Sequence, residues 1–184
     1  MDTVLEIVPY DPEWPHVFLA ERDRIAAALG ALALRIDHNG STSVPGLAAK
    51  PTVDIQVSVE RLHPIDTYAP QFAQLGYIHV PHPDDAFCPF FHMPAVWPHT
   101  HHVHVVQAGG DEERRTLAFR DYLREHSDTA REYADLKHQL APRFIATELS
   151  SRQAYADAKT SFINCVVARA LSEGYPRGYE ARRS

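Results

Sequence analysis

The chain has few cysteines, no long apolar run and no excess of basic residues among its 184 amino acids. Its two cysteines, Cys88 and Cys165, stand far apart, so the sequence favours two separate thiols over a disulfide or a zinc knuckle. No apolar run approaches the roughly 18 to 20 residues that a membrane-spanning helix needs, which excludes a membrane span. The formal net charge of −6 argues against a nucleic-acid-binding protein, because such proteins normally carry a basic surface.

A secretory signal is also missing from the first six residues, which have neither a basic start nor an apolar core. We therefore expect a cytoplasmic protein. The length fits a single domain over residues 1–184. We divide it into a sheet core over residues 1–110, C-terminal helices over residues 111–173 and a frayed tail over residues 174–184. Nothing in the sequence indicates the oligomeric state.

The spacing of apolar residues predicts the order of the elements. A first helix is expected from Pro12 to Leu29, with Asp11 as its cap and Gly30 as its end. Strand patterns cover residues 3–8, 32–38, 52–59, 77–80, 87–93 and 101–106, and a short helix covers residues 64–75. After residue 111 the helical period predicts three helices of about ten or more residues. This order indicates an α+β fold, in which a mixed sheet precedes a helical segment.

A loop rich in glycine and hydroxyl groups joins two of these strands. Gly40 lets the backbone approach a ligand closely, and the hydroxyls of Ser41 and Thr42 can hold phosphate oxygens together with backbone amides. The next strand presents Asp54 on its polar face, where a carboxylate can hold a divalent metal that bridges phosphates. The pattern predicts a triphosphate-binding loop. The alternative is a common Gly-Ser turn followed by an aspartate that only forms hydrogen bonds.

Histidines form a second cluster, since seven of the twelve fall between His79 and His104. His102 and His104 project from one face of their predicted strand. With Asp54 they would make a set of two histidines and one carboxylate, which suits Zn²⁺, Mn²⁺, Fe²⁺ or Ni²⁺ better than Mg²⁺. Either histidine is also a candidate general base, because imidazole titrates near a pH of about 6.5. A structural role by ring stacking or partial exposure is the alternative, and we favour it for His82, His92, His99 and His101.

A third group of candidates is cationic. Arg120 and Arg124 share one face of a predicted helix, and Tyr155 and Lys159 share a face of another, so each pair can present a joint surface to an anion. Lys50 lies between the glycine turn and the strand aspartate and can reach the same place. The alternative for each of these residues is an ordinary surface ion pair.

Several segments together resemble one known family. Residues 40–55 read GSTSVPGLAAKPTVDI, residues 11–15 DPEWP, residues 102–105 HVHV and residues 119–124 FRDYLR, and the aromatic and lysine spacings over residues 133–137 and 155–162 agree. The chain is identified by these motifs, over nearly its whole length, as a member of the GrpB (UPF0157) family. That family is similar to the nucleotidyltransferase superfamily, which implies a nucleotidyltransferase-like mixed β-sheet flanked by helices, with a C-terminal helical segment.

The resemblance also implies a chemistry. Nucleotidyl transfer would use Asp54 as the main ligand of a divalent metal, Mg²⁺ or Mn²⁺ with Zn²⁺ as an alternative, and His102 or His104 as a further ligand or base. Lys159 would act with Arg120 to neutralise developing charge. Phosphate binding would fall to Gly40, Ser41, Thr42, Lys50, Arg120, Arg124 and Tyr155. The partners would be a nucleotide and a small-molecule acceptor, with no nucleic acid and no membrane.

One position departs from the pattern of active nucleotidyltransferases. Such enzymes carry two carboxylates at positions i and i+2 of one strand, but here Asp54 is followed by Gln56, and histidines stand where a third carboxylate is expected. An amide adds no charge for a second Mg²⁺. Two other functions therefore remain open. One is an inactive module that binds a nucleotide or CoA-type ligand or acts like a chaperone, since some family members are fused to dephospho-CoA kinase. The other is a histidine–aspartate metal enzyme that does not use nucleotides.

Overall fold

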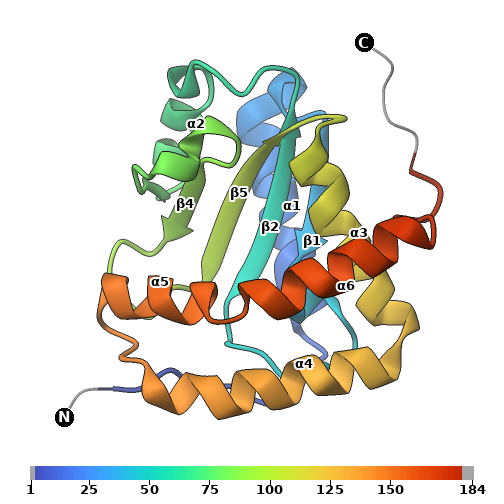
Figure 1. The fold of residues 1–184 in the computed structure, drawn as a ribbon. Coiled ribbons are helices and arrows are strands. Elements are labelled where there is room, and N and C mark those ends of the chain that lie inside the picture. The colour runs from blue at the N-terminus through green and yellow to red at the C-terminus, as the bar shows by residue number, and fades with distance from the viewer. Residues whose placement is uncertain (1–2, 180–184) are drawn as a thin grey trace.

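The computed structural model describes residues 3–179, which form a mixed five-stranded sheet with helices on both faces (Figure 1). The strands are β1 (Arg35–Asn39), β2 (Val53–Val59), β3 (Ile78–His79), β4 (Phe90–Met93) and β5 (His101–Gln107). They lie in the order β1-β2-β5-β4-β3. Only β2 and β5 run parallel, whereas the other neighbours are antiparallel. The two longest strands therefore lie together near the centre of the sheet.

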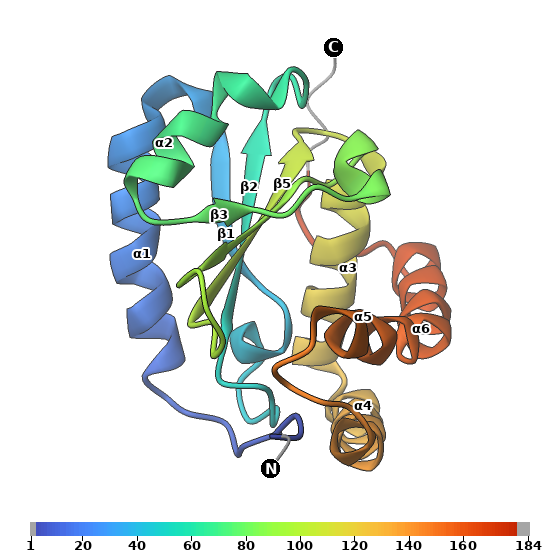
Figure 2. The ribbon, with the colours of Figure 1, turned by 90° about the vertical axis from the view of Figure 1, so that its left-hand side faces the viewer.

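Helices α1 (Trp14–Leu29) and α2 (Ala69–Gln74) cover one face of the sheet (Figure 2). Trp14, Phe18, Ile25 and Leu29 recur at helical spacing on α1 and are all buried. They pack against alternate residues of β2, namely Val53, Ile55, Val57 and Val59. Because side chains alternate along a strand, this packing directs the polar residues of β2 to the opposite face.

That opposite face is covered by α3 (Asp111–Glu125), α4 (Ser127–Leu140), α5 (Leu149–Asp157) and α6 (Thr160–Ser172) (Figure 2). Three acidic residues in the first turn of α3 favour its start, because they oppose the positive end of the helix dipole. The C-terminal helices share a second apolar core, which includes Tyr122, Tyr133, Val166 and Ala170. Within residues 3–179, no helix has both the length and the apolar character to cross a bilayer.

The predicted α+β class is confirmed, and five of the six predicted strands are present with shifted ends. The strand expected over residues 3–8 is wrong. Its residues form only two isolated bridges, Val4 with Ile145 and Val8 with Ala49. Helix α1 begins at Trp14 rather than Pro12, because Asp11 accepts a hydrogen bond from the Glu13 amide (2.9 Å) in the turn before the helix.

The C-terminal part also differs from the prediction. Four helices replace the expected three, because a turn at residues 158–159 divides the third expected helix into α5 and α6. Residues 174–179, expected to begin a frayed tail, pack onto α3 instead. Tyr175 is buried, and the Tyr179 hydroxyl donates to Glu113 Oε2 (2.5 Å). The rest of the expected tail, residues 180–184, lies outside the described residues.

Candidate functional site

The predicted site residues of the sheet lie on its polar face, on neighbouring strands whose register places them side by side. Asp54 on β2 lies opposite Asn39 on β1 and beside His102 on β5. One pair further along, Gln56 lies beside His104. The alternation of side chains thus gathers two imidazoles, two amides and the carboxylates of Asp54 and Asp37 on a single face.

The turn after β1 approaches this face so closely that only glycine fits. Gly40 has φ +64°, and a Cβ atom there would lie 2.3 Å from Asp54 Oδ2. A short helical turn follows over Ser41–Ser43, and Ser43 Oγ donates to the Gly40 carbonyl oxygen (2.6 Å). The conformation of Gly40 and its missing side chain therefore bring the backbone of the predicted phosphate-binding loop against Asp54.

Asp54, His102 and His104, which we call the Asp54 site, form a connected set. Asp54 Oδ1 lies 3.2 Å from His102 Nδ1 and 3.9 Å from His104 Nε2, and its side chain is 29% exposed, so solvent reaches it. Burial alone would raise the pKa of Asp54, but the imidazoles of the two neighbouring histidines outweigh burial and hold the pKa well below its usual range. Asp54 is therefore an anion at neutral pH.

The two histidines differ in charge. Burial lowers the pKa of His102 to about 4 against the opposing effect of Asp54. For His104, burial is outweighed by the neighbouring Asp54 carboxylate and the Cys88 thiol, which raise the pKa. At neutral pH, His102 is therefore neutral and His104 is an imidazolium.

Each histidine also has a partner that the sequence did not reveal. His99 Nδ1 lies 3.1 Å from His102 Nε2, and the His99 ring stacks on His92 with 3.9 Å between ring centroids. His99 thus helps to hold the orientation of His102. On the other side, the half-buried Cys88 lies with Sγ 3.8 Å from His104 Nδ1.

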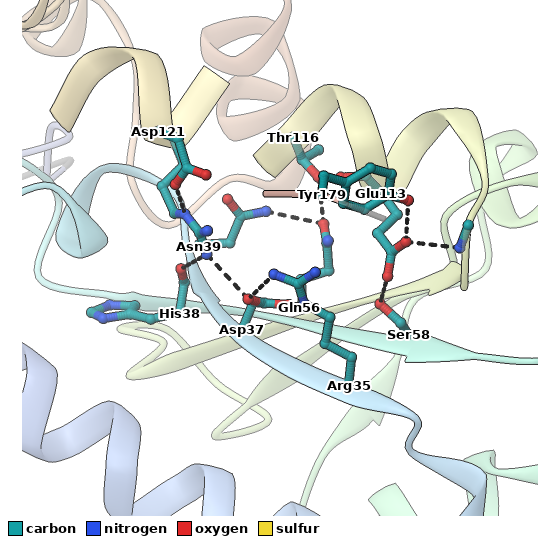
Figure 3. Close-up of polar contacts among 12 residues, drawn as sticks. Arg35, Asp37, His38, Asn39, Gln56, Ser58, Glu113, Thr116, Asp121 and Tyr179 are labelled. Carbon is teal, nitrogen blue, oxygen red and sulfur yellow. Dashed lines mark hydrogen bonds and ion pairs between the residues drawn. The ribbon is translucent and has the colours of Figure 1, made fainter. Parts of the chain in front are cut away.

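Gln56 stands where the second carboxylate of the expected pair would be, and it belongs to a separate layer of polar side chains. Gln56 is fully buried, and its Oε1 accepts hydrogen bonds from Asn39 Nδ2 (3.1 Å) and Thr116 Oγ1 (2.5 Å). Figure 3 shows these side chains under α3, next to Glu113 and Ser58. We call Asn39, Gln56, Ser58, Glu113 and Thr116 the α3 layer.

The donors do not fit a site for two divalent metals. Among residues 3–179, no group of three or more His, Cys, Asp or Glu side chains is arranged to hold a metal ion. The oxygen of Gln56 is occupied within the α3 layer, and both ring nitrogens of His102 have protein partners. Asp54 remains as a donor for one ion, and His104 can join it only after losing the proton that makes it an imidazolium.

Three lysines lie near the Asp54 site, and we call Lys50, Lys137 and Lys159 the lysine cluster. Lys137 Nζ donates to Ser41 Oγ (3.0 Å) and to the Ala48 carbonyl oxygen. Lys159 Nζ lies 4.0 Å and Lys50 Nζ 5.6 Å from the centre of the Tyr155 ring. Lys50, Lys159 and Tyr155, all predicted as site residues, are thus brought together.

Other predicted phosphate ligands are engaged within the protein. Arg120 donates to Asp121 Oδ1 (2.7 Å), to Asp37 Oδ1 and to the His38 carbonyl oxygen (both 3.2 Å). Arg124 donates twice to the Ser43 carbonyl oxygen (3.0 and 2.8 Å). Thr42 is buried with its hydroxyl 3.0 Å from His38 Nε2. These residues brace β1 and the glycine turn rather than extend toward a ligand.

Sequence reasoning missed Lys137 as a candidate. It was read only as part of a helical motif, and its contact with Ser41 spans 96 positions of the chain. A signal was present, however, because the whole chain has only three lysines and all three belong to this cluster.

Comparison with known proteins identifies the family. The family model described as GrpB protein matches residues 4–169. This chain belongs to the GrpB family. A UPF0157 protein of Halalkalibacterium halodurans is 39% identical over 90% of this chain and 82% of its own length. A dephospho-CoA kinase of Mycolicibacterium paratuberculosis is 31% identical over 76% of this chain, which matches 40% of the kinase chain.

Solved structures agree with the fold. The crystal structure of the conserved protein GrpB from Enterococcus faecalis superposes with a TM-score of 0.76 at 33% identity, covering 91% of this chain and 98% of that one. The GLD-2/RNP-8 complex matches with a TM-score of 0.59 over 96% of this chain and 70% of that one. Its identity is 13%, so this likeness concerns the fold alone. This GrpB chain has the nucleotidyltransferase-like fold that the motifs predicted.

Proposed function

We propose that this GrpB protein binds the phosphate chain of a nucleotide beside Asp54 and, with one divalent ion, transfers the nucleotidyl group to a small-molecule acceptor. The observation that carries the proposal is the contact of the Gly40 turn with Asp54, with Lys137 bound to Ser41 of the same turn. Backbone amides, a hydroxyl, an ammonium group and a carboxylate are the groups that hold a metal-bound phosphate. The nucleotidyltransferase-like fold supports the choice of reaction.

In the proposed reaction an acceptor hydroxyl forms a bond to the α-phosphorus, the bond to the bridging oxygen breaks, and pyrophosphate leaves. A divalent ion would supply charge neutralisation and orientation. Asp54 would hold this ion together with His104, which would release its proton to solvent as the ion binds. Imidazole as a donor favours Mn²⁺ or Zn²⁺ over Mg²⁺. Neutral His102 would accept the proton of the acceptor hydroxyl rather than His104, which is already charged, and it would first have to release its contact with Asp54 or His99.

The first test is a thermal-shift titration of ATP, CTP, GTP and UTP with Mg²⁺, Mn²⁺ or Zn²⁺. At a hundredfold excess over Kd, a ligand adds about 2.7 kcal/mol of stability, which raises the Tm by about 5–10 °C in a chain of this size. We expect the metal-dependent part of this shift to disappear in Asp54→Asn, because an amide removes the anionic ligand without changing the shape.

Asp66→Asn is the matched control, since Asp66 is exposed on a short helical turn and forms no hydrogen bond or ion pair among the described residues. It should keep the full shift. If no nucleotide raises the Tm with any metal, or if Asp54→Asn responds like the native protein, the proposal is wrong. A Zn²⁺ shift that needs no nucleotide would instead favour the histidine–aspartate metal enzyme.

A second candidate, a module that binds a nucleotide or CoA-type ligand without turnover, is favoured by the contacts of Gln56. An amide engaged with Asn39 and Thr116 cannot hold a second ion without breaking these hydrogen bonds. Pyrophosphate release from the bound nucleotide separates the two candidates. If the native protein releases none and Gln56→Asp gains metal-dependent release, the native protein is the binding module.

A further inference from the structure

The use of lysine in this chain is unusually selective. Of its 18 lysines and arginines only three are lysines, at positions 50, 137 and 159, and the other 15 are arginines. They come from three separate places: the loop before β2, the last turn of α4 and the turn between α5 and α6. Every lysine of the protein nevertheless belongs to the lysine cluster.

Geometry ties the three ammonium groups to one location. Lys50 and Lys159 both approach the ring of Tyr155. Lys137 contacts the Ala48 carbonyl, two residues before Lys50, and the Ser41 hydroxyl. Ser41 follows Gly40, whose backbone touches Asp54. The cluster therefore borders the glycine turn and Asp54.

The cluster carries more positive charge than its surroundings balance. In residues 3–179, the ion pairs with N–O distances up to 4.0 Å include none that involves Lys50, Lys137 or Lys159. Burial first, and then Lys50 and Lys137, lower the pKa of Lys159 to about 7, while Asp54 opposes the shift. A bound anion would relieve this repulsion.

Two further observations point to an anionic ligand at this location. The Tyr155 hydroxyl is buried, with the residue 1% exposed, and has no hydrogen-bond partner among the described residues. It offers a donor without an acceptor. Helix α6 begins at Thr160, directly after Lys159, and no side chain of the described residues caps its first amides. Free amides at a helix start attract anions.

We propose that the lysine cluster binds a chain of two or more phosphate groups directly and replaces the charge of the second divalent ion that Gln56 cannot hold. The ligand class is the polyphosphate part of a nucleoside di- or triphosphate. This inference rests on the proposed function for the placement of the phosphates, and it adds that their binding does not require a metal. Three compact ammonium groups supply the positive charge that the second metal supplies in a site with two carboxylates.

The test is calorimetric titration of the native protein with inorganic tripolyphosphate at low salt in EDTA. We expect measurable binding, which weakens at least tenfold in Lys159→Met and in Lys137→Met and is largely retained in Lys159→Arg. Arg131→Met is the matched control, because Arg131 is an exposed cation on α4, the helix that carries Lys137. Circular dichroism establishes that each variant is folded. Asp54→Asn should bind tripolyphosphate several-fold more tightly in EDTA, because it loses the one carboxylate near the cluster.

The outcomes separate this inference from the proposed function. Binding that appears only when Mn²⁺ or Mg²⁺ is added would overturn the inference and leave the proposed function intact. Binding in EDTA that the lysine variants do not weaken would also overturn it. A third outcome is lysine-dependent binding in EDTA together with a nucleotide-induced rise in Tm that is the same in Asp54→Asn and the native protein. It would support the inference, whereas the proposed function would be wrong.

Discussion

The two polar clusters on the same face of the sheet differ in how their charges are balanced. In the α3 layer, Glu113 accepts hydrogen bonds from Ser58 Oγ (2.5 Å), the Gly109 amide (2.8 Å) and Tyr179 (2.5 Å) (Figure 3). In the lysine cluster, three lysine amino groups share the field of one carboxylate, Asp54, and burial lowers the pKa of each of them.

Buried charges that serve only the stability of a fold are normally paired or hydrogen-bonded within the protein. The α3 layer follows this rule for its one carboxylate, although Gln56 Nε2 has no partner among residues 3–179. The lysine cluster does not follow it. The contrast teaches that strand β2 contributes to structure through Gln56 and Ser58, whereas Asp54 on the same strand is the residue to which the proposed function assigns ligand binding.

The largest effect should follow from breaking the α3 layer at Glu113. Glu113→Ala removes a buried carboxylate that accepts hydrogen bonds from three donors, among them the buried Ser58, and we expect a loss of about 3 kcal/mol in the free energy of unfolding. Glu112→Ala is the matched control, because Glu112 lies in the same helical turn but pairs only with Arg115 near the surface. It should cost about 0.5 kcal/mol or less.

Urea unfolding measures both changes. Tripolyphosphate affinity of folded Glu113→Ala should stay within about twofold of the native value, because the α3 layer does not contribute to the lysine cluster. Equal stabilities of the two variants would contradict the structural role of Glu113. A large loss of affinity in the folded variant would mean that the two clusters are not separable.

A smaller effect on stability, with a larger one on binding, should follow at the glycine turn. Gly40→Ala and Gly46→Ala both place a methyl group at positive φ, which costs about 1–2 kcal/mol. At Gly46 nothing lies within 4 Å of the added atom, whereas at Gly40 it meets Asp54 at 2.3 Å. Only Gly40→Ala should therefore displace Asp54 and lose the metal-dependent nucleotide shift. Loss of that shift in both variants would mean that loop strain, rather than contact with Asp54, is responsible.

Much of this arrangement follows from patterns that are local in sequence. The alternation along β2 and β5 predicts which residues share a face, and the Gly40 turn with Asp54 is predicted by residue type and by the family motif. The likeness of solved structures confirms the fold that the motifs imply. The roles of the site residues stay predictions.

Other features depend on tertiary contacts that no local pattern contains. Arg120 and Arg124 share a helical face as predicted, but their guanidinium groups meet acceptors on β1 and in the glycine turn, 81 or more positions away. The contact of His99 with His102 depends on the path of the chain into β5, where Thr52 Oγ1 donates to the His99 carbonyl oxygen (3.0 Å). The pairing of Tyr179 with Glu113 likewise requires α6 to be in place.

The smallest effect concerns the pH dependence of stability and isolates Lys137. This lysine is buried, and burial lowers its pKa from 10.5 to about 7, with a contribution from Lys50 and opposition from Asp54. Between pH 7 and pH 10.5 the unfolded chain therefore holds a proton at Lys137 that the native protein has lost. Stability should consequently rise with pH across this window, by at most about 1.4 kcal/mol per pH unit from this group.

Lys137→Met removes this contribution, so its free energy of unfolding should rise less steeply than that of the native protein between pH 7.5 and pH 8.5. Urea unfolding at both pH values measures the difference of the two slopes, in which the titration of all other groups largely cancels. Arg131→Met should retain the native slope, because an arginine stays charged throughout the window. Parallel curves for native protein and Lys137→Met would mean that Lys137 keeps its proton in the native state. Saturating tripolyphosphate should flatten the native slope, since a bound anion raises the pKa of the lysines that contact it.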